Sequence, residues 1–469
     1  MSNAFSETWE SPPEDLLKDL DAPGPRYTSY PTADRFDDRF GPAEYLAALR
    51  ERAAAQRPGA LAPLSLYVHL PFCESVCYYC ACNKVVTRHH ERAGPYLDAL
   101  EREAALLDAA LGSPQSVSQL HLGGGTPTFL TDGELARLMA LVRRHFKLQA
   151  HAELSIEVDP RTASESRLEA LASLGFNRVS FGVQDFDPAV QRAIHRVQPF
   201  EQVRDLIQAA RALGFKSINT DLIYGLPNQT PASFALTVSQ VASLRPDRIA
   251  LYAYAHLPAR FPPQRRIADQ DLPPAQDRLR MLSQALAGFL VRGYQYIGMD
   301  HFALPTDALA VAKRQGRLHR NFQGYTTQPE SDLIGLGVSA ISKVGVTYAQ
   351  NEKALPAYGR ALQEGRLPIS RGVRVTRDDL VRRAVIMALM CQGEVDFEAV
   401  ECAHLVQFPS YFAEELALLG PWRDRGLLEM DDSRLQVTAR GWYFVRAIAM
   451  TFDRHLRATQ DRSRFSRII

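Results

Sequence analysis

Four cysteines lie within ten residues of the chain, directly after a short apolar run. Cys73, Cys77 and Cys80 have the spacing C-x₃-C-x₂-C, and Cys82 follows two residues later. Dense runs of thiolates of this kind bind iron–sulfur clusters. We therefore expect the first three to hold a [4Fe–4S] cluster with one iron open to a reacting ligand. A fourth thiolate would block that iron, so we expect Cys82 not to bind metal.

Two other uses of these cysteines are less consistent with the spacing. A structural zinc site normally takes its second pair of ligands from a dozen or more residues away, and the sequence has no distant C-x₂-C or H-x₃-H pair. A disulfide framework is disfavoured because Cys391 and Cys402 lie far along the chain and nothing suggests secretion. The cluster therefore remains the first interpretation, ahead of zinc and redox thiols.

Composition limits the partners that the chain can have. Its 469 residues are 46% hydrophobic, enough for a large core and for two or three domains. The net charge of +1 gives no general attraction to nucleic acid or to an anionic membrane. The first 21 residues contain no apolar signal region, and no run reaches the ~18 apolar residues that span a bilayer. We expect a cytoplasmic protein, where thiols stay reduced.

Six short apolar segments recur at intervals that suit strand–helix units. They are 65–72, 119–123, 153–158, 178–184, 217–223 and 248–255. Such near-continuous apolar runs are typical of parallel strands that are covered on both faces. Repeated units of this kind predict an α/β fold. Six units, and not eight, favour an open, partial (β/α)6 barrel.

Helix starts are marked between these strands. Capping boxes are expected at Thr131 with Glu134 and at Thr162 with Glu165, and caps before a first-turn proline at Asp187 and Thr230.

Polar and glycine residues follow the predicted strands. Cys73 follows the first strand, a triple glycine with Gly124 the second, Glu157 ends the third, Gln184 the fourth, and Asp221 the fifth. In barrels of parallel strands these ends meet at one mouth. Glycines would let backbone approach a ligand closely, and their successive N–H groups could cradle an anion. We expect a cofactor site there.

Two flanking regions differ from the central one. Residues 1–50 are predicted to be an N-terminal arm, because 24–32 is rich in proline and turn formers. Residues 51–370 would form the catalytic domain. Residues 371–469 are predicted to be mainly helical, with a helix after Thr376, a β-hairpin at 426–438 and a last amphipathic helix through Arg457. This winged-helix-like region is weakly charged, which favours a lid or packing role over DNA binding.

The cysteine loop, 67–84, resembles that of the HemN-type oxygen-independent coproporphyrinogen III dehydrogenases of the radical SAM superfamily. The resemblance continues through 25–32, 121–128, 157–160, 182–186, 221–227, 255–258, 297–302, 319–325, 335–342 and 465–467. It therefore covers the chain from about residue 24 to its end.

The resemblance implies two molecules of S-adenosylmethionine beside the [4Fe–4S] cluster. Contacts to the cluster-bound molecule would come from Tyr67, Gly124, Glu157 and Ile341. Contacts to the second would come from Tyr79, Gly125, Thr126, Gln184, Arg196, Asp221 and Ala255. The family often has phenylalanine where this chain has Tyr79, and a tyrosine keeps the ring face for stacking.

The reaction that the resemblance implies is oxidative decarboxylation of the ring A and B propionates of coproporphyrinogen III, which gives protoporphyrinogen IX. A 5′-deoxyadenosyl radical would take a hydrogen from the propionate β-carbon, after which carbon dioxide leaves and one electron passes to an unknown acceptor. The catalytic candidates are Cys82, Tyr67 and His69. The substrate carboxylates need cationic or hydrogen-bonding partners, and the candidates are Arg26, Tyr27, Tyr30 and His69.

The expected partners are coproporphyrinogen III and a flavodoxin- or ferredoxin-like electron donor, with no nucleic acid and no membrane, and the expected state is a monomer. Three alternatives remain open: a heme chaperone of the HemW type, a radical SAM enzyme of another tetrapyrrole, and a scaffold with an inert cluster. HemW-type relatives typically lack the fourth cysteine and the 26–32 arm, and both are present here.

Overall fold

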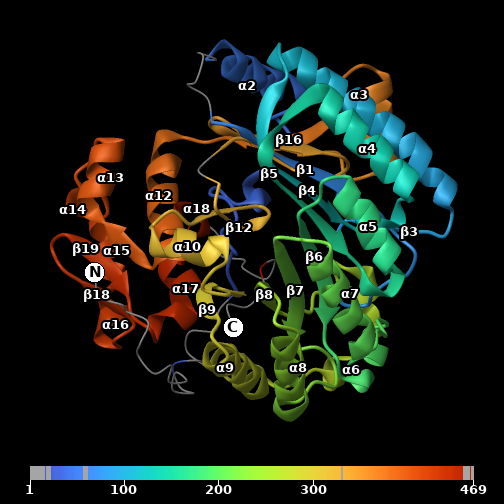
Figure 1. Ribbon diagram of the computed structural model, residues 1–469. Helices are drawn as coiled ribbons and strands as arrows, with labels where there is room; N and C mark the ends of the chain where they lie inside the picture. The colour runs from blue at the N-terminus through green and yellow to red at the C-terminus, as the bar shows by residue number, and fades with distance from the viewer. Residues whose placement is uncertain (1–15, 17–22, 56–61, 329–330, 458–464, 466–469) are drawn as a thin grey trace.

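A twelve-stranded sheet runs through the centre of the molecule (Figure 1). This computed structural model describes residues 16, 23–55, 62–328, 331–457 and 465. Six consecutive neighbours in the sheet are parallel and follow chain order: β1 (Leu64–Leu70), β4 (Gln115–Gly124), β5 (Phe146–Val158), β6 (Arg178–Gln184), β7 (Ser217–Tyr224) and β8 (Arg248–Ala253). They coincide with the six predicted segments, so the partial (β/α)6 barrel is confirmed.

The sheet continues beyond both ends of this parallel set. On the outer side of β1 lies a further parallel strand, β13 (Leu333–Leu336), which the sequence did not predict. Antiparallel strands complete the edges: β14 (Ile341–Val344), β15 (Thr347–Asn351) and β16 (Ile369–Arg374) beyond β13, and β10 (His301–Ala303) and β9 (Gln295–Gly298) beyond β8. β1, which leads into the cysteine loop, is therefore hydrogen-bonded on both sides.

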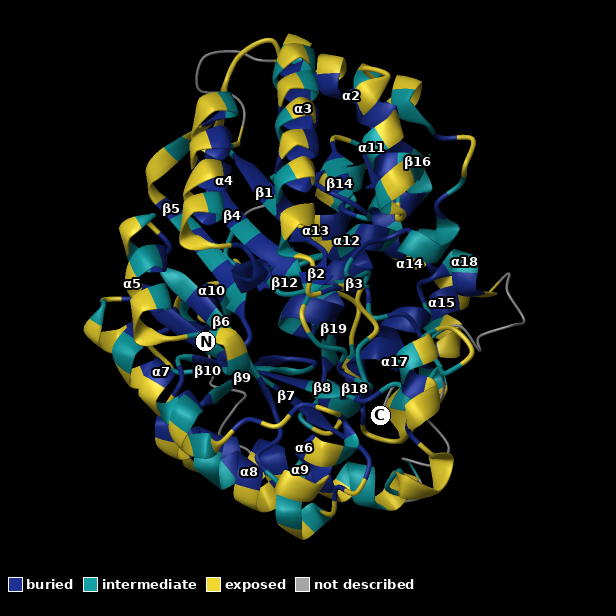
Figure 2. Ribbon diagram, turned by 90° about the vertical axis from the view of Figure 1, so that its right-hand side faces the viewer, coloured by how far each residue is buried: buried dark blue, intermediate teal, exposed yellow. Residues whose placement is uncertain are grey.

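Amphipathic helices cover the outer face of the curved sheet (Figure 1). They are α3 (Ala93–Leu111), α4 (Asp132–His145), α5 (Glu165–Ser173), α6 (Pro188–Ala193), α7 (Phe200–Ala212), α8 (Pro231–Leu244) and α9 (Ala275–Val291). In α4, Leu135, Leu138, Met139 and Val142 are buried, and this spacing places them on one helix face. Figure 2 shows the same division along α3 and α4, with an exposed outer side and a buried inner side.

The predicted helix starts are confirmed with one exception. Thr131, Thr230 and Asp187 each accept a hydrogen bond from the first turn of their helix. Thr162, in contrast, ends the short 3₁₀ turn η4 (Pro160–Thr162), and Ser164 caps α5 by accepting from Arg167 N at 3.2 Å. The box at Thr162 was therefore wrong, because the η4 turn occupies that residue and Ser164 stands directly before the helix.

The N-terminal arm first contacts the C-terminal region and then continues to the barrel. Gly24 and Pro25 accept hydrogen bonds from Arg446, and Tyr27 donates to Asp453 at 3.0 Å. A 3₁₀ turn, η1 (Ala33–Arg35), follows. Then α2 (Pro42–Ala54) packs against α3 and β14–β16, across the expected arm boundary at residue 50.

The C-terminal region begins with α12 (Arg377–Gln392), whose cap is Thr376 as predicted. Its small sheet has the order β17 (Glu394–Asp396), β19 (Arg434–Val437), β18 (Leu428–Met430), and the predicted hairpin is its β18–β19 pair. The helices are α13 (Phe397–His404), α14 (Phe408–Tyr411), α15 (Ala413–Leu418) and α16 (Gly420–Asp424).

The chain end differs from the predicted single amphipathic helix. It is divided into η7 (Gly441–Phe444), α17 (Val445–Met450) and α18 (Arg454–Arg457), and all residues of α17 are buried. A helix that is covered all round has no exposed polar stripe, so an amphipathic pattern was the wrong expectation for it.

Shorter elements connect these parts. They are β2 (Phe72–Cys73), β3 (Val85–Val86), η2 (His90–Arg92), η3 (Pro127–Phe129), η5 (Pro262–Arg266), η6 (Asp269–Asp271), α10 (Ala308–Arg314), β11 (His319–Asn321), β12 (Gly324–Thr326) and α11 (Leu355–Gln363). None of the helices in the described part of the chain is both long and apolar enough to cross a bilayer.

Candidate active site

The cysteine loop stands at the end of β1. The strand ends at Leu70, and the pairing of β2 with β3 closes the loop between Cys73 and Val85. Cys73, Cys77, Cys80 and Cys82 all line one cavity of about 380 Å³. Thr126 Oγ1 lies 3.5 Å from Cys73 Sγ, and Arg196 Nη1 lies 3.5 Å from Cys77 Sγ. Polar groups therefore surround the thiols inside a cavity.

The glycine loop after β4 packs directly against the cysteine loop. Gly125 N donates to Leu70 O and Thr126 N to Phe72 O, both at 2.8 Å. A Cβ on Gly125 would lie 2.7 Å from the backbone of Pro71 and Phe72. Gly124 N donates to Glu157 at 3.1 Å. These N–H groups already have acceptors, so the glycines allow two loops to approach and do not form the anion cradle that we expected.

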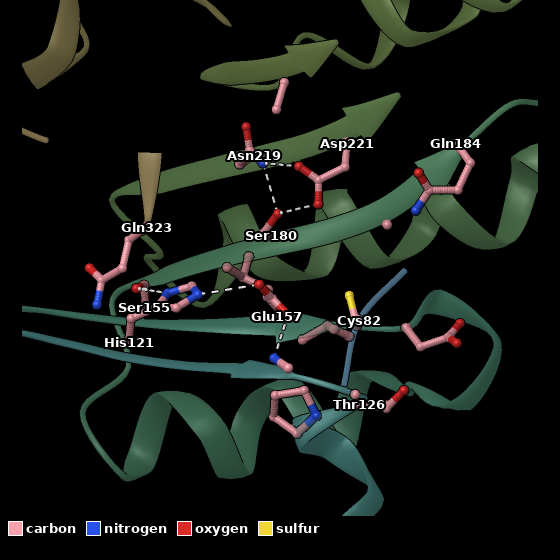
Figure 3. Close-up of a pocket in the computed structure, with 18 of the residues that line it drawn as sticks. Cys82, His121, Thr126, Ser155, Glu157, Ser180, Gln184, Asn219, Asp221 and Gln323 are labelled. Atoms are coloured by element: carbon pink, nitrogen blue, oxygen red, sulfur yellow. Dashed lines mark hydrogen bonds and ion pairs between the residues drawn. The ribbon is translucent and has the colours of Figure 1, made fainter. Parts of the chain in front are cut away.

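A row of polar side chains crosses the cavity from β4 to β7 (Figure 3). His121 binds Ser155 Oγ at 2.6 Å and Glu157 Oε1 at 3.4 Å, and Asp221 accepts from Ser180 at 3.0 Å and Asn219 at 2.8 Å. Side chains two apart in a strand share a face, so Ser155 and Glu157 of β5, like Asn219 and Asp221 of β7, enter the cavity together. This explains how separate segments converge.

Two carboxylates of this row have pKa values that are shifted in opposite directions. Burial acts to raise the pKa of Glu157, but hydrogen bonds from His121 and Gly124 hold it below its usual range. Burial, together with the charge of Glu157, raises the pKa of Asp221 to about 6. Near neutral pH, Glu157 is therefore ionised, while Asp221 keeps part of its proton. Paired environments of this kind are typical of functional sites.

Arg196 connects the cysteine loop to the ends of β5 and β6. It is buried, donates to Asp159 at 3.0 Å and to Gly182 O at 2.7 Å, and touches Cys77. Gln184, which ends β6, has a left-handed backbone (φ 67) that is unfavourable for a side-chain-bearing residue. Strain of this kind persists where the surroundings enforce it, which is common at ligand sites.

Most of the predicted cofactor residues line the cavity. In addition to the cysteines, these are Tyr79, Gly124, Gly125, Thr126, Glu157, Gln184, Arg196 and Asp221. The remaining cofactor candidates, Tyr67, Ala255 and Ile341, are not among its lining residues, and neither is the catalytic candidate His69. Ala255 O accepts from Gln264 at 3.1 Å, and Ile341 begins β14.

Tyr67 and His69 form a support beneath the cysteine loop. Tyr67 Oη lies 3.0 Å from His69 Nδ1, and His69 Nε2 lies 2.8 Å from Asn83 O. The ring of Tyr67 also stacks on that of His121, with 5.9 Å between centroids. Both ring nitrogens of His69 therefore have partners, and burial lowers its pKa. This arrangement suits a residue that fixes the loop.

The arm residues that we predicted for substrate binding divide into two groups. Tyr27 and Tyr30 are buried, and their hydroxyls bind Asp453 and Arg454 N in the C-terminal region, so they do not face the cavity. Arg26 pairs with Asp300, and its guanidinium lies 5.3 Å from the ring centre of Tyr252, which lines the cavity. Of the three, Arg26 alone is near the cavity.

Two family matches cover separate parts of the chain. Residues 67–241 match the Radical SAM superfamily, and residues 375–444 match the HemN C-terminal domain. The chain is 50% identical to oxygen-independent coproporphyrinogen III oxidases from Pseudomonas aeruginosa and Escherichia coli, over 97% of its length and 98% of theirs. This chain belongs to the oxygen-independent coproporphyrinogen III oxidase family.

A solved structure agrees with this membership. The structure described as coproporphyrinogen III oxidase (HemN) from Escherichia coli, a radical SAM enzyme, has a TM-score of 0.89 and 49% identity. The match covers 96% of this chain and 99% of that one. A more distant family member, from Helicobacter pylori, is 43% identical over 93% of this chain and 95% of its own length. Family features thus extend across both the barrel and the C-terminal region.

Membership of the radical SAM superfamily implies a [4Fe–4S] cluster and S-adenosylmethionine. The thiols of this oxidase family member line one cavity together, which fits a cluster. Among the described residues, no three His, Cys, Asp or Glu side chains converge closely enough to hold one metal ion. A cluster takes one thiolate on each of several irons, and Cys73, Cys77 and Cys80 at this cavity would supply three.

The last two cysteines of the loop, Cys80 and Cys82, differ in their surroundings. A hydrogen bond from Cys82 lowers the pKa of Cys80 to about 6, and the same contact raises that of Cys82. Cys82 is the more exposed of the two. The contact thus favours the thiolate form of Cys80 and the thiol form of Cys82.

Several residues that line the cavity were not predicted from the sequence. They are Ser155, Ser180, Asn219, Tyr252, His301, Gln323 and Tyr325. The first three could have been found, because each stands two or four residues before a polar strand end and so shares its face. The others lie beyond the fifth predicted strand, and no local pattern marks them as polar partners of the cavity.

Proposed function

We propose that this chain catalyses the oxygen-independent oxidative decarboxylation of the ring A and B propionates of coproporphyrinogen III, giving protoporphyrinogen IX in heme biosynthesis. The observation that carries the proposal is 50% identity to enzymes of that name over nearly the whole length of both chains. The cavity with four cysteines is consistent with it. The chain is thus an oxidoreductase of the radical SAM superfamily.

The cofactor residues are proposed as follows. Cys73, Cys77 and Cys80 hold the cluster, and two molecules of S-adenosylmethionine bind in the cavity. Tyr67, Gly124, Glu157 and Ile341 serve the first molecule. Tyr79, Gly125, Thr126, Gln184, Arg196, Asp221 and Ala255 serve the second. Support comes from the fact that most of these side chains line the same cavity as the thiols.

The cluster and S-adenosylmethionine, when bound, would supply 5′-deoxyadenosyl radical chemistry, and the residues of the cavity would position and shield the reactants. Ionised Glu157 can accept hydrogen bonds from an amino group. Asp221, with its pKa of about 6, can both donate and accept near neutral pH. Cys82 keeps its proton as a thiol near the substrate. Tyr67 and His69 act by holding the loop.

The remaining assignments follow from the function. We propose a flavodoxin- or ferredoxin-like electron donor and an acceptor still to be identified, a cytoplasmic monomer, and no nucleic-acid or membrane partner. The proposed limits are an arm at 1–50, a catalytic domain at 51–370 and a C-terminal domain at 371–469. The family matches at 67–241 and 375–444 lie inside the last two.

An anaerobic assay tests the reaction. Protein reconstituted with iron and sulfide receives S-adenosylmethionine, a reductant, coproporphyrinogen III and an anaerobic cell extract as the source of the electron acceptor, and chromatography separates the porphyrin products. We expect a mono-vinyl intermediate and then protoporphyrinogen IX. If 5′-deoxyadenosine accumulates without any vinyl product, the substrate assignment fails, although the radical chemistry stands. HemW-type heme binding and action on another tetrapyrrole are the alternatives that such a result would revive.

Cysteine variants test the cluster assignment. Cys77→Ala removes a proposed ligand, and we expect loss of the bound cluster's visible absorption and of activity, by a factor of about 10² or more. Cys402→Ala is the matched control, because Cys402 is exposed on α13, outside the cavity. A Cys77→Ala protein that keeps its iron content and activity would show that the cluster assignment is wrong.

A further inference from the structure

One end of the cavity contains a buried histidine ring atom that the proposed function leaves unused. His301, on β10, lines the cavity, and its Nδ1 atom is buried with no hydrogen-bond partner among the described residues. The rings of Tyr252 and Tyr325 stand edge-on to it at 6.0 and 5.3 Å. Because a buried polar atom without a partner destabilises the folded protein, native structures rarely contain one unless it serves a purpose. The atom therefore points to a ligand.

The charges around His301 indicate which kind of ligand. Arg26, Arg248 and Arg320 all act on it electrostatically. Arg26 pairs with Asp300, and Arg248 pairs with Asp307 at 2.8 Å. Arg320 has no carboxylate partner within the described part of the chain, although it is only 5% exposed. Of the three arginines that act on His301, Arg320 is thus the one without an ion-pair partner among the described residues.

Arg320 lies behind the ring of Tyr325, which lines the cavity, and itself lines a second, neighbouring cavity. Its guanidinium lies 4.6 Å from the ring centre of Tyr325, and its Nη2 donates to Arg26 O at 3.4 Å. Its Nε and Nη1 atoms have no hydrogen-bond partner among the described residues. A buried guanidinium is normally paired, because its desolvation is costly. An anion in the cavity would supply the missing charge across a short, low-dielectric distance.

The protonation state of His301 agrees with an anionic ligand. Burial, and then the three arginines, lower its pKa well below the usual range, so the ring is neutral and carries one N–H donor. A metal ion or an ammonium group would be repelled by the unpaired guanidinium. A carboxylate would be attracted by it and could accept the N–H of His301.

We propose that His301 is the contact residue of a carboxylate subsite, with Tyr252 beside it and Arg320 as a positioning charge behind Tyr325. This inference rests on the proposed function, and the geometry points to a propionate of the tetrapyrrole as the carboxylate. β10 is separated from β1, the strand of the cysteine loop, by the strands β4 to β8. The methionyl carboxylate of S-adenosylmethionine is the other source of the same chemistry.

Equilibrium binding separates these possibilities. The probes are coproporphyrin III, which carries four free propionates, its tetramethyl ester, which carries none, and S-adenosylmethionine. The anaerobically reconstituted full-length protein should bind the free acid more tightly than the ester. His301→Phe keeps a ring and removes both nitrogens, and we expect it to weaken binding of the free acid about tenfold and to leave the ester unchanged. His301→Asn returns a polar group near Nδ1 and should recover part of the loss.

Two further variants control for folding. Arg320→Met removes the charge and keeps an extended, unbranched side chain, so it should weaken binding of the free acid by a smaller factor while the ester is unaffected. His151→Phe makes the same change as His301→Phe at an exposed position on β5 and should change nothing. If Arg320 served only to hold the arm, its variant would unfold earlier and would weaken both porphyrins equally.

The outcomes assign the ligand or overturn the subsite. An equal loss of acid and ester in His301→Phe, or no preference of the unaltered protein for the acid, would overturn the proposal. A loss confined to S-adenosylmethionine would overturn the propionate assignment and assign the carboxylate to the cofactor. Formation of vinyl product by the unaltered protein is scored separately, so failure of the proposed function is distinguishable from failure of the subsite.

Discussion

Individual residues of the cavity differ in how much of their role can be seen in the sequence. Glu157 and Asp221 were selected because they end predicted strands, and both line the cavity. Tyr27 and Tyr30 were selected for a polar substrate, but their hydroxyls bind groups more than four hundred residues away. No local sequence pattern could indicate a hydrogen-bond partner that lies so far along the chain. The role of a polar residue can thus be predicted where the end of a strand fixes its position. It cannot be predicted where a residue far along the chain determines which way the side chain points.

The raised pKa of Asp221 predicts a pH-dependent stability. Its pKa of about 6 in the folded state exceeds the ordinary 3.8, so folding favours the protonated form. The stability from this group is complete below about pH 4 and is lost as the pH rises through about 6. Asp221→Asn should therefore raise the free energy of unfolding of the cofactor-free protein by about 3 kcal/mol at pH 8, and by nothing at low pH. Denaturant unfolding across pH 4–8 measures this.

The control for that prediction lies in the partners of Asp221. Asn219 donates to Oδ1 and Ser180 to Oδ2 of Asp221. The introduced amide keeps the Asn219 contact through its oxygen, and its NH2 group can donate to Ser180 Oγ once that hydroxyl turns to accept, so the change removes the charge and leaves both neighbours with a partner. A constant difference between Asp221→Asn and the parent at every pH would contradict the assigned pKa.

At the scale of elements, the six parallel strands of the barrel could be predicted, but the neighbouring strand β13 could not. Six apolar runs, each between turn signals, predicted all six consecutive parallel strands, because each run keeps at least one face buried. β13 was not predicted, because four residues are too few to show a strand pattern and because its partner, β1, lies far away in the sequence. Thr162 was misassigned as a cap because two polar residues compete before α5.

The contact between the cysteine loop and the glycine loop predicts the effect of one methyl group. In Gly125→Ala the new Cβ would meet backbone atoms of Pro71 and Phe72, which cannot rotate away. We expect the loops to separate, with a loss of about 2 kcal/mol or more in unfolding free energy and reduced iron content after reconstitution. Thermal unfolding and iron analysis measure the two effects.

Gly133→Ala provides the comparison. Gly133 lies in α4, and a Cβ there would meet nothing within 4 Å. Because alanine has the higher helix propensity, this variant should be as stable as the parent or slightly more so. Equal iron content in Gly125→Ala and Gly133→Ala would mean that the two loops do not need to approach this closely.

At the scale of the whole molecule, the arm joins the barrel to the C-terminal region. Tyr27 is buried, and its hydroxyl binds Asp453, whose own pKa is raised by burial. Tyr27→Phe leaves that carboxylate without one donor, and we expect a loss of about 1–2 kcal/mol in unfolding free energy. Cleavage by a protease near residue 24 should become faster. If the melting temperature and the cleavage rate both equal those of the parent, the hydroxyl does not fasten the arm.

The position of β13 has a consequence for biosynthesis. Because β1 lies between β4 and β13, the strand that leads into the cysteine loop lacks one of its two neighbours until residues 333–336 have left the ribosome. Long-range parallel pairing of this kind forms late. The strand that leads into the cysteine loop therefore gains its second neighbour only after about seven-tenths of the chain has been made.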